Sequence, residues 1–216
     1  MNDWIKRYIA CQFPIIPLGR RSKTPVTRGW VENSYPASAF RNGNVGTRAG
    51  ERVNVDGRQG YLLIVDFDSP DVSILRQLCE TIPLPRTTCV RSGGVHRGYH
   101  LYYLTEEATR KRGMLAYKGA SVDLLGKGSF AVVPPSVVDE PYRYLIGLDE
   151  LAFLSSDGYD QLVATLSHWK RVNAVIKHVT NGKLTYDQAR EQLIDQQATP
   201  EMIAHLCDSL NDLPAD

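Results

Sequence analysis

The chain has 216 residues, of which 43% are hydrophobic and 23% are charged, and its formal net charge at pH 7 is +1. These values are typical of a globular protein, and they exclude a disordered chain and a strongly basic chain that coats nucleic acid without selectivity. The length suits one sizeable domain with a small appendage.

The sequence shows no signal for a membrane span, for secretion or for a disulfide scaffold. Its longest apolar stretches, near 61–65 and 130–135, are far shorter than the roughly 20 residues that cross a bilayer. Prolines at 14 and 17 interrupt the N-terminal segment, which lacks the apolar core of a secretion signal. The four cysteines form no C-x-x-C pair. We therefore expect a cytoplasmic protein with reduced cysteines.

The N-terminal quarter predicts one short helix followed by short strands. Apolar residues from Trp4 to Gln12 recur at roughly helical spacing, which ends before Pro14. A brief apolar strand follows in PIIPLG, and the loop after it, RRSKTPVTRGW, is basic and exposed. The segment NVGTRAG predicts another short strand, and ERVNVDGRQG predicts a hairpin-like loop.

The central region predicts the strongest strand and the helix after it. Residues Tyr61 to Phe67 form the clearest strand pattern of the chain. A helix is expected across Ser69 to Thr81, with Ser69 as its N-cap and Pro70 at its first position. One face of this helix would carry three apolar side chains: Val72, Leu75 and Leu78.

Two glycine-containing turns predict two hairpins. The segments TTCVRSGG and GYHLYYL are strand-like and are joined by a glycine-rich turn. Later, 121–125 and 129–133 are apolar runs separated by Gly126, Lys127 and Gly128. We interpret this second pair as a hairpin as well.

Beyond Asp149 the sequence has no strand signal and predicts three helices. Their helical spacing covers 161–179, 186–196 and 200–210, with Thr185 and Thr199 as N-caps. We therefore divide the chain into a main domain, 1–150, and a helical C-terminal segment, 151–216. Basic residues near 170–178 suggest that this segment contributes to template binding or initiation.

Two aspartates at the end of the strongest strand form a candidate metal site. Side chains at alternate strand positions share one face, so Asp66 and Asp68 project together while Phe67 faces the other way. Magnesium and manganese bind oxygen ligands, usually one or two carboxylates with substrate phosphates. The alternative is structural, because Asp68 and Ser69 could cap the next helix.

Asp123 is a candidate third ligand. It stands in the apolar strand SVDLLG, where an unpaired buried charge would be costly. A third carboxylate that meets the other two across neighbouring strands would bind cations with them. The alternative is a solvent-facing residue on an edge strand.

His100 lies within RGYHLYYL and His96 lies in the turn before it. The spacing H-x-x-x-H brings zinc ligands together on a helix, and the nearby glycines at 93, 94 and 98 make a helix unfavourable. Zinc is therefore disfavoured. Several basic residues lie near these motifs, and they could neutralise phosphates or simply be solvated: Lys23, Arg48, Arg91, Lys118 and Lys127. The glycines match neither the P-loop nor the dinucleotide-binding pattern.

The order of these motifs resembles the primase-polymerase (Prim-Pol) family of the archaeo-eukaryotic primase superfamily. The resemblance covers roughly 13–144 and rests on KTPVTRGW, GTRAG, LLIVDFD, RSGGVHRGYHLYYL, VDLLGKGSFAVVPPS and PYRY. It implies an α/β (α+β) catalytic module with an RRM-like layer, followed by the small helical appendage. Some relatives carry a zinc-binding insertion near the histidine motif, and this sequence has no matching cysteine cluster.

The resemblance also implies roles for individual residues. Asp66, Asp68 and Asp123 would bind two catalytic Mg²⁺ or Mn²⁺ ions, and His100, or alternatively His96, would bind nucleotide phosphate. Nucleotide or template contacts would come from Lys23, Arg48, Arg91, Ser92, Lys127 and Ser136.

The implied activity is template-dependent nucleotidyl transfer, as a DNA primase or a DNA polymerase. Its partners would be a single-stranded DNA template, a primer strand and nucleoside triphosphates, with a helicase as a separate partner or as a further C-terminal domain. The setting would be replication of a plasmid, a virus or another mobile element. Two alternatives stay open: a metal-dependent nuclease, and an inactive nucleic-acid-binding module that keeps the fold.

Overall fold

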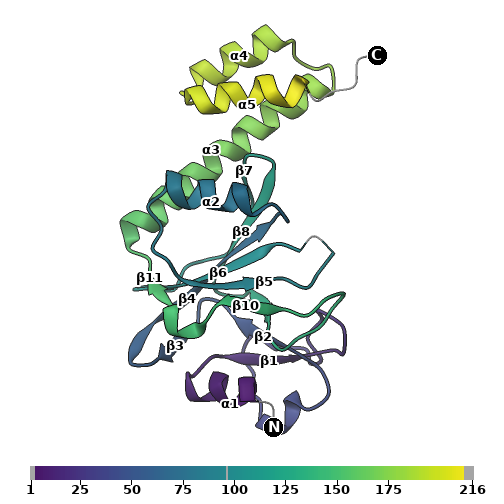
Figure 1. Cartoon of the computed structure of the whole chain (residues 1–216), viewed down its shortest axis with the longest axis vertical. Coiled ribbons are helices and arrows are strands. Elements are labelled where there is room, and N and C mark those ends of the chain that lie inside the picture. The colour runs from purple at the N-terminus through teal and green to yellow at the C-terminus, as the bar shows by residue number, and fades with distance from the viewer. Residues whose placement is uncertain (1–2, 96, 212–216) are drawn as a thin grey trace.

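The computed structural model describes residues 3–95 and 97–211, and its strands form two sheets (Figure 1). The strands of the eight-stranded sheet are β3 (Arg52–Val55), β4 (Arg58–Asp68), β5 (Thr88–Arg91), β6 (Tyr99–Thr105), β7 (Arg112–Tyr117), β8 (Ala120–Leu125), β10 (Arg143–Ile146) and β11 (Ala152–Phe153). Their main order is β10-β5-β6-β4-β8-β7, with β3 beside β4 and β11 beside β6. The three-stranded sheet has the order β1-β2-β9 and consists of β1 (Ile15–Leu18), β2 (Asn44–Arg48) and β9 (Phe130–Val133).

The long strand β4 divides the hydrophobic core in two, because its successive side chains point to opposite faces of the sheet. Leu63, Val65 and Phe67 are fully buried in a core shared with the helices. Leu62 and Ile64 are fully buried in a second core, shared with the three-stranded sheet. The large sheet is therefore covered by helices on one face and by the small sheet on the other.

The N-terminal helix α1 (Asp3–Ala10) confirms the helix predicted before Pro14, and it packs on the small-sheet side. Its buried side chains, Ile5 and Tyr8, belong to the second core. A short 3-10 helix, η1 (Ala37–Phe40), precedes β2, and a second, η2 (Leu148–Glu150), precedes β11.

The helix after β4 begins later than its sequence predicts. Helix α2 (Val72–Thr81) has Asp71 as its N-cap, whose carboxylate accepts a hydrogen bond from Ser73 N at 2.8 Å. The prediction of Ser69 as N-cap and Pro70 as the first helical residue is therefore wrong. Both Ser69 and Asp71 are good capping residues, so the local sequence did not distinguish them.

The predicted apolar face of α2 is correct in part. Leu75 and Leu78 are buried, but Val72 is 46% exposed because it lies at the first helical position, outside the contact with the sheet.

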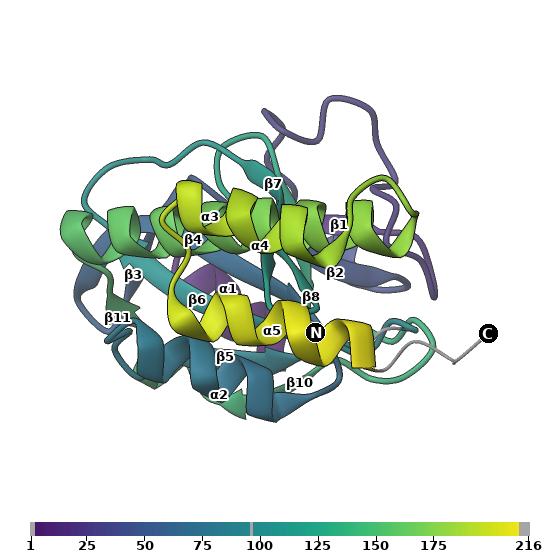
Figure 2. The same cartoon turned by 90° about the horizontal axis from the view of Figure 1, so that it is seen from above.

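The three predicted C-terminal helices are present as α3 (Ser156–Thr180), α4 (Tyr186–Asp195) and α5 (Pro200–Asn211). Thr185 caps α4 through a capping box with Gln188, as predicted for that threonine. Figure 2, viewed from above, shows these helices on the side of the large sheet that is away from α1.

Helix α3 shares its core with the large sheet. Its side chains Leu162, Leu166 and Trp169 are buried in the same cluster as Val65 and Phe67 of β4. The proposed division at 150/151 stays a prediction, and in the structure the first helix of the C-terminal segment is part of the main core.

The predicted hairpin of 121–125 and 129–133 is wrong. Strand β8 pairs with β4 and β7, whereas β9 pairs with β2 of the small sheet. The turn carries the chain from one sheet to the other, and Gly128 in this turn has a φ of +83°. Turn glycines between two apolar runs indicate a change of direction, but they do not determine the partner strand.

Four strands were not predicted as strands: β3, which lies in the segment interpreted as a hairpin-like loop, and β7, β10 and β11. The register of β7 shifts between Arg112 and Leu115, and Met114 within the shift has a φ of +57° and is 77% exposed. This bulge interrupts the alternation that identifies a strand. Strand β11 also corrects the expectation that no strand follows Asp149.

The architecture confirms the α+β class, with two mainly antiparallel sheets and helices. The finer prediction of an archaeo-eukaryotic primase-like module with an RRM-like layer stays a prediction. Within 3–95 and 97–211, no helix has both the length and the apolar character that crossing a membrane requires.

Candidate active site

Three of the predicted site residues form one row across the large sheet. Asp66 of β4 is directly opposite His100 of β6 on one side and directly opposite Asp123 of β8 on the other. Directly opposed residues project from the same face, with Cβ atoms about 5 Å apart. Strand pairing between segments far apart in the sequence therefore gathers these side chains at one place.

The row lies where the contact between the two sheets ends. It shares a face with Leu62 and Ile64, which are fully buried against the small sheet. The side chain of Asp66 is 27% exposed, and Asp68, two residues further along the same face, is exposed. The acids thus line the open edge of the interface between the sheets.

Asp66 and His100 form a close pair. Nε2 of His100 lies 3.3 Å from Oδ1 of Asp66, and the imidazole is buried. Burial raises the pKa of Asp66, but His100, Lys23 and Lys111 together outweigh burial and hold that pKa below its ordinary value. Asp66 is therefore kept ionised. The other ring nitrogen of His100, Nδ1, is buried and has no partner among the described residues.

Asp123 is held by the bulge in β7. Its Oδ1 accepts a hydrogen bond from Met114 N at 2.8 Å, and its Oδ2 lies 3.7 Å from Nζ of Lys111. The bulge turns the Met114 amide toward the carboxylate, which explains the positive φ of that residue. Lys111 was not among the predicted site residues, because it precedes a strand that the sequence pattern did not reveal.

Asp68 is the carboxylate that the surroundings favour least in its charged form. Burial raises its pKa, the neighbouring Asp66 raises it further, and Asp123 adds to this, while His100 and Lys23 act in the opposite direction. The pKa of Asp68 consequently lies above its ordinary value. A bound cation would relieve this repulsion between like charges.

The oxygen donors suit a hard divalent cation, although they do not converge on one point. Across 3–95 and 97–211, no three His, Cys, Asp or Glu side chains form a ready-made metal-binding group. Asp66 is turned toward His100 and Asp123 toward Lys111, as expected for mutually repelling carboxylates that pair with the nearest positive groups. Carboxylate oxygens at neighbouring positions of two adjacent strands, β4 and β8, fit Mg²⁺ or Mn²⁺ by chemistry.

Lys23 reaches the acids from the loop after β1. It lowers the pKa of Asp66 and acts in the same direction on Asp68, so its ammonium group lies near both. A Cβ atom at Gly94 would lie 2.9 Å from Nζ of Lys23, which is too close. Glycine at 94 therefore lets the Lys23 side chain pass beside the loop between β5 and β6.

Tyr142 is a further residue of the site that the predictions did not include. Its ring lies 5.9 Å from the imidazole of His100, measured between centroids. Burial raises the pKa of Tyr142 far above its usual value, and Asp66 adds to that shift, so the phenol stays protonated. The sequence signal was PYRY, which the predictions used only as a family motif.

Arg91 lies away from the acids. It is directly opposite Tyr99 on β6, so it projects from the face opposite to His100, and its guanidinium stacks over the Tyr99 ring at 4.3 Å. Its Nη1 lies 3.4 Å from the carbonyl oxygen of Pro70. Neighbouring residues of a strand face opposite ways, so Arg91 is not part of the row of Asp66 and His100, and its contact with nucleotide or template stays a prediction.

Arg48 and Ser136 are engaged in structural contacts. Nη1 of Arg48 donates to the carbonyl groups of Trp30, Val31 and Asn33, and so holds the loop between β1 and β2. Ser136 is buried, and its hydroxyl group exchanges two hydrogen bonds with the backbone of Val45, at 2.8 and 3.0 Å. Their contacts with nucleotide or template stay predictions.

The other predicted residues lie in loops. Ser92 donates its backbone amide to Gly98 O at 2.9 Å, closing the turn after β5. Lys127 is exposed between β8 and β9, with its backbone amide bonded to Thr109 O at 2.8 Å. His96 lies outside the described residues, so its competition with His100 stays open.

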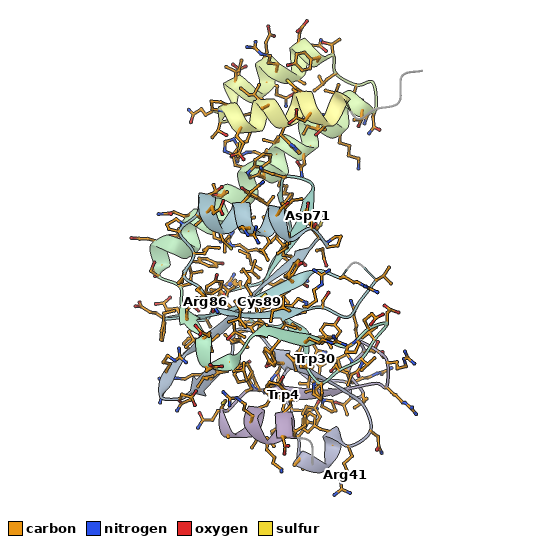
Figure 3. The ribbon with its side chains drawn as sticks, viewed as in Figure 1. Trp4, Trp30, Arg41, Asp71, Arg86 and Cys89 are labelled. Carbon is orange, nitrogen blue, oxygen red and sulfur yellow. The ribbon has the colours of Figure 1, made fainter. Side chains whose placement is uncertain are left out.

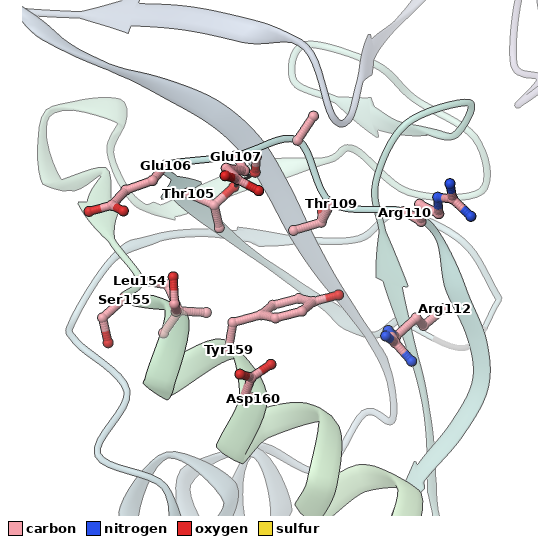
Figure 4. A pocket seen from close by; sticks show the side chains of 12 residues that line it. Thr105, Glu106, Glu107, Thr109, Arg110, Arg112, Leu154, Ser155, Tyr159 and Asp160 are labelled. Carbon is pink, nitrogen blue, oxygen red and sulfur yellow. Dashed lines mark hydrogen bonds between the residues drawn. The ribbon is translucent and has the colours of Figure 1, made fainter.

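A separate pocket of about 400 Å³ lies between the loop after β6 and the start of α3 (Figure 4). It combines basic and acidic side chains, among them Arg110, Arg112, Glu107 and Asp160. None of the predicted site residues lines it. The candidate active site is therefore the open acidic edge and not this pocket.

Comparison with known proteins adds a family to this geometry. The family model described as "Bifunctional DNA primase/polymerase, N-terminal" matches residues 5–155. No curated protein matches the chain. The matched region includes Asp66, His100 and Asp123 and covers more than half of the sequence. The chain therefore belongs to the Prim-Pol family.

Proposed function

We propose that the chain catalyses template-dependent nucleotidyl transfer, as a DNA primase, a DNA polymerase or both, with divalent metal held by Asp66, Asp68 and Asp123. The observation that carries this proposal is the row of Asp123, Asp66 and His100 on adjacent strands, at the open edge between the sheets. The family supports primase or polymerase activity in general. The metal mechanism, the partners and the mobile-element setting are our inference.

The proposed division of labour follows from the charges. When bound, Mg²⁺ or Mn²⁺ would neutralise the triphosphate and favour attack of the primer hydroxyl on the α-phosphate. Asp66, ionised through its contact with His100, and Asp123, oriented by Met114 N, supply oxygen ligands. Lys23 and Lys111 add positive charge beside the acids, which favours a phosphate chain.

His100 has two tasks in this proposal. It orients Asp66 through Nε2, and it contacts the phosphate of the incoming nucleotide. Its unpartnered, buried Nδ1 supports a role beyond packing, because a buried polar atom without a partner costs free energy in the ligand-free protein.

Primer extension tests the proposal directly. The protein is incubated with a primed single-stranded template, labelled nucleotides and Mg²⁺ or Mn²⁺, and Asp66→Asn and Asp123→Asn serve as test variants. Asp71→Asn is the matched control, because it makes the same change at an exposed helix cap where asparagine also caps well. We expect wild type and the control to lengthen the primer and both test variants to fail.

The alternatives give different results in the same assay. Strand shortening would identify a metal-dependent nuclease. Template binding without any change of strand length, under all metal and nucleotide conditions, would identify an inactive binding module. Extension by Asp66→Asn or Asp123→Asn at the wild-type rate would refute the metal assignment.

A further inference from the structure

A basic concavity lies beside the small sheet, outside the acidic site. It has a volume of about 780 Å³ and is formed by the loop after β1, the start of β2 with the segment before it, and one residue of the loop after β9. Three arginines line it: Arg20, Arg21 and Arg41. An adjoining concavity of about 210 Å³ shares Arg20 and Arg41, which extends the basic surface.

The positive charge of this concavity is not neutralised by the protein. Within the described part of the chain, no carboxylate forms an ion pair with Arg20, Arg21 or Arg41. All three arginines are exposed, and Figure 3 shows Arg41 extending outward from the end of the molecule that carries α1. Three like charges around one hollow repel each other, so an anion bound there would be stabilising.

The walls of the concavity are held in place by the backbone. Asn44 is buried, and its side chain bonds to Ser22 O at 3.1 Å and to both backbone groups of Val137, at 2.8 and 3.0 Å. A Cβ atom at Gly43 would lie 2.2 Å from Leu18 O, so only glycine lets the two loops approach this closely. The arginines are therefore presented by a rigid frame, which reduces the entropy cost of binding.

The same loop connects the concavity with the acidic site. Gly19 N bonds to Thr24 O at 2.9 Å and closes a compact turn, in which Arg21 has a φ of +51°. Arg20 and Arg21 line the concavity, with Nε of Arg21 3.4 Å from Val138 O, while the charge of Lys23 lowers the pKa of Asp66. Arg21 and Lys23 are two residues apart, so their Cα atoms lie within about 7 Å. A chain of phosphates bound by the arginines would thus lead to the acids.

We propose that Arg20, Arg21 and Arg41 form a binding site for backbone phosphates of single-stranded nucleic acid, next to the nucleotide site. The inference rests on the proposed function only in assigning this strand as the template. Arginine is suited to the task, since its planar guanidinium group donates paired hydrogen bonds to phosphate and never loses its charge. The concavity is open and wide, which suits a strand that passes through.

The salt dependence of binding gives the expected size of the effect. For single strands, the logarithm of the affinity falls with the logarithm of salt concentration with a slope of about −0.7 per neutralised phosphate. Replacing all three arginines by alanine should therefore make the slope shallower by about 2. At about 0.1 M salt, this corresponds to an affinity loss of about 100-fold.

The test measures binding of a fluorescent single-stranded oligonucleotide by anisotropy, without metal or nucleotide, over a range of salt concentrations. The test variant is Arg20→Ala/Arg21→Ala/Arg41→Ala, and a second version with lysine at the same positions keeps the charge. The matched control removes three exposed arginines from helices and leaves 170–178 unchanged: Arg7, Arg76 and Arg190. Thermal melting verifies that each variant is folded.

We expect the alanine variant to show the 100-fold loss and the shallower slope, the lysine variant to retain most of the binding, and the control to resemble wild type. Equal losses in the test and control variants, or no loss in the test variant, would overturn the proposal. Oligonucleotides with a 5′-hydroxyl and a 5′-triphosphate are compared in parallel. A loss seen only with the triphosphate would overturn the assignment to backbone phosphates in favour of a terminal phosphate.

Because this assay needs no catalysis, its failure is distinguishable from failure of the proposed function. Arginine-dependent binding by a protein that never extends a primer would refute nucleotidyl transfer and leave the phosphate site in place. Extension that is unaffected in the alanine variant, together with unchanged binding, would refute the phosphate site and leave nucleotidyl transfer in place.

Discussion

Replacing Asp68 by asparagine should stabilise the metal-free protein. Burial and the neighbouring Asp66 raise the pKa of Asp68, which means that the folded protein favours its uncharged form. Asparagine has nearly the same shape and carries no charge. The variant therefore removes a repulsion from the folded state without creating a cavity.

The size of the gain follows from the spacing along β4. Two residues apart on a strand, Asp66 and Asp68 are separated by about 7 Å. Two unit charges at that distance interact by ~2.4 kcal/mol at an effective dielectric constant of about 20 and by ~0.6 kcal/mol in water. Since Asp68 is exposed, solvent screening places the gain at about 1 kcal/mol. A domain of this length would melt about 2–4 °C higher.

The gain should depend on pH with a defined sign. The wild-type protein recovers the lost stability when Asp68 is protonated, that is, as the pH falls through a folded-state pKa above 3.8. The difference in melting temperature between variant and wild type is thus largest near neutral pH and shrinks as the pH falls toward 4 and below. Asp66 has the opposite pH dependence, because its lowered pKa stabilises the fold at higher pH. Since wild type and the variant both contain Asp66, its contribution is common to the two melting temperatures.

Mn²⁺ should reverse the order of stability. A ligand at a hundred times its dissociation constant stabilises the folded state by about 2.7 kcal/mol, and the variant binds the cation more weakly. The assay is thermal denaturation at several pH values, with and without Mn²⁺, using Asp71→Asn as the control. A variant that melts below wild type without metal, or whose gain does not shrink at acidic pH, would refute the reasoning.

Three further predictions concern the same fold. Asp66→Ala or Asp123→Ala should abolish nucleotide incorporation with an unchanged circular dichroism spectrum, and near wild-type extension by either variant would contradict the metal assignment. His100→Ala should raise the nucleotide concentration needed for half-maximal extension far more than His96→Ala, and the reverse order would move the motif to His96. Truncation after Gly158 should give an unfolded protein, because it removes the buried side chains Leu162, Leu166 and Trp169, worth about 2–5 kcal/mol each. Truncation after Gly182 keeps these three residues and should leave a folded protein of reduced stability.

Much of the candidate site could be predicted because it depends on local rules. Alternation along one strand places Asp66 and Asp68 on the same face. Asp123 is a charged residue within an apolar run, so it needed a partner that compensates its charge. The order of motifs supplied the family, which the family model confirms. What local rules could not supply is that β6 and β8 flank β4, since strand pairing is decided by contacts distant in sequence.

The errors have the same origin. The glycine turn before β9 was interpreted as a hairpin, but the two flanking strands belong to different sheets. Arg91 was grouped with the other basic residues by its closeness in sequence to the motifs, and the sequence could not show that its pairing with Tyr99 puts it on the face opposite to His100. Lys111 and Tyr142 were missed because each directly precedes a strand with a weak strand pattern, the bulged β7 and the irregular β10.

The distribution of charge bears on where a template would lie. The basic residues that motivated a template-binding role for the C-terminal segment lie on α3, whereas α4 and α5 carry five acidic residues against one arginine: Asp187, Glu191, Asp195, Glu201 and Asp208, with Arg190. Phosphates are repelled by such a surface. The arginine concavity is formed beside β1 and β2, and Figure 1 shows these strands at the end of the molecule opposite to α4 and α5. A strand guided by charge would therefore approach the acids from the small-sheet side, and α4 and α5 would affect initiation through the stability of α3 and not by holding the template.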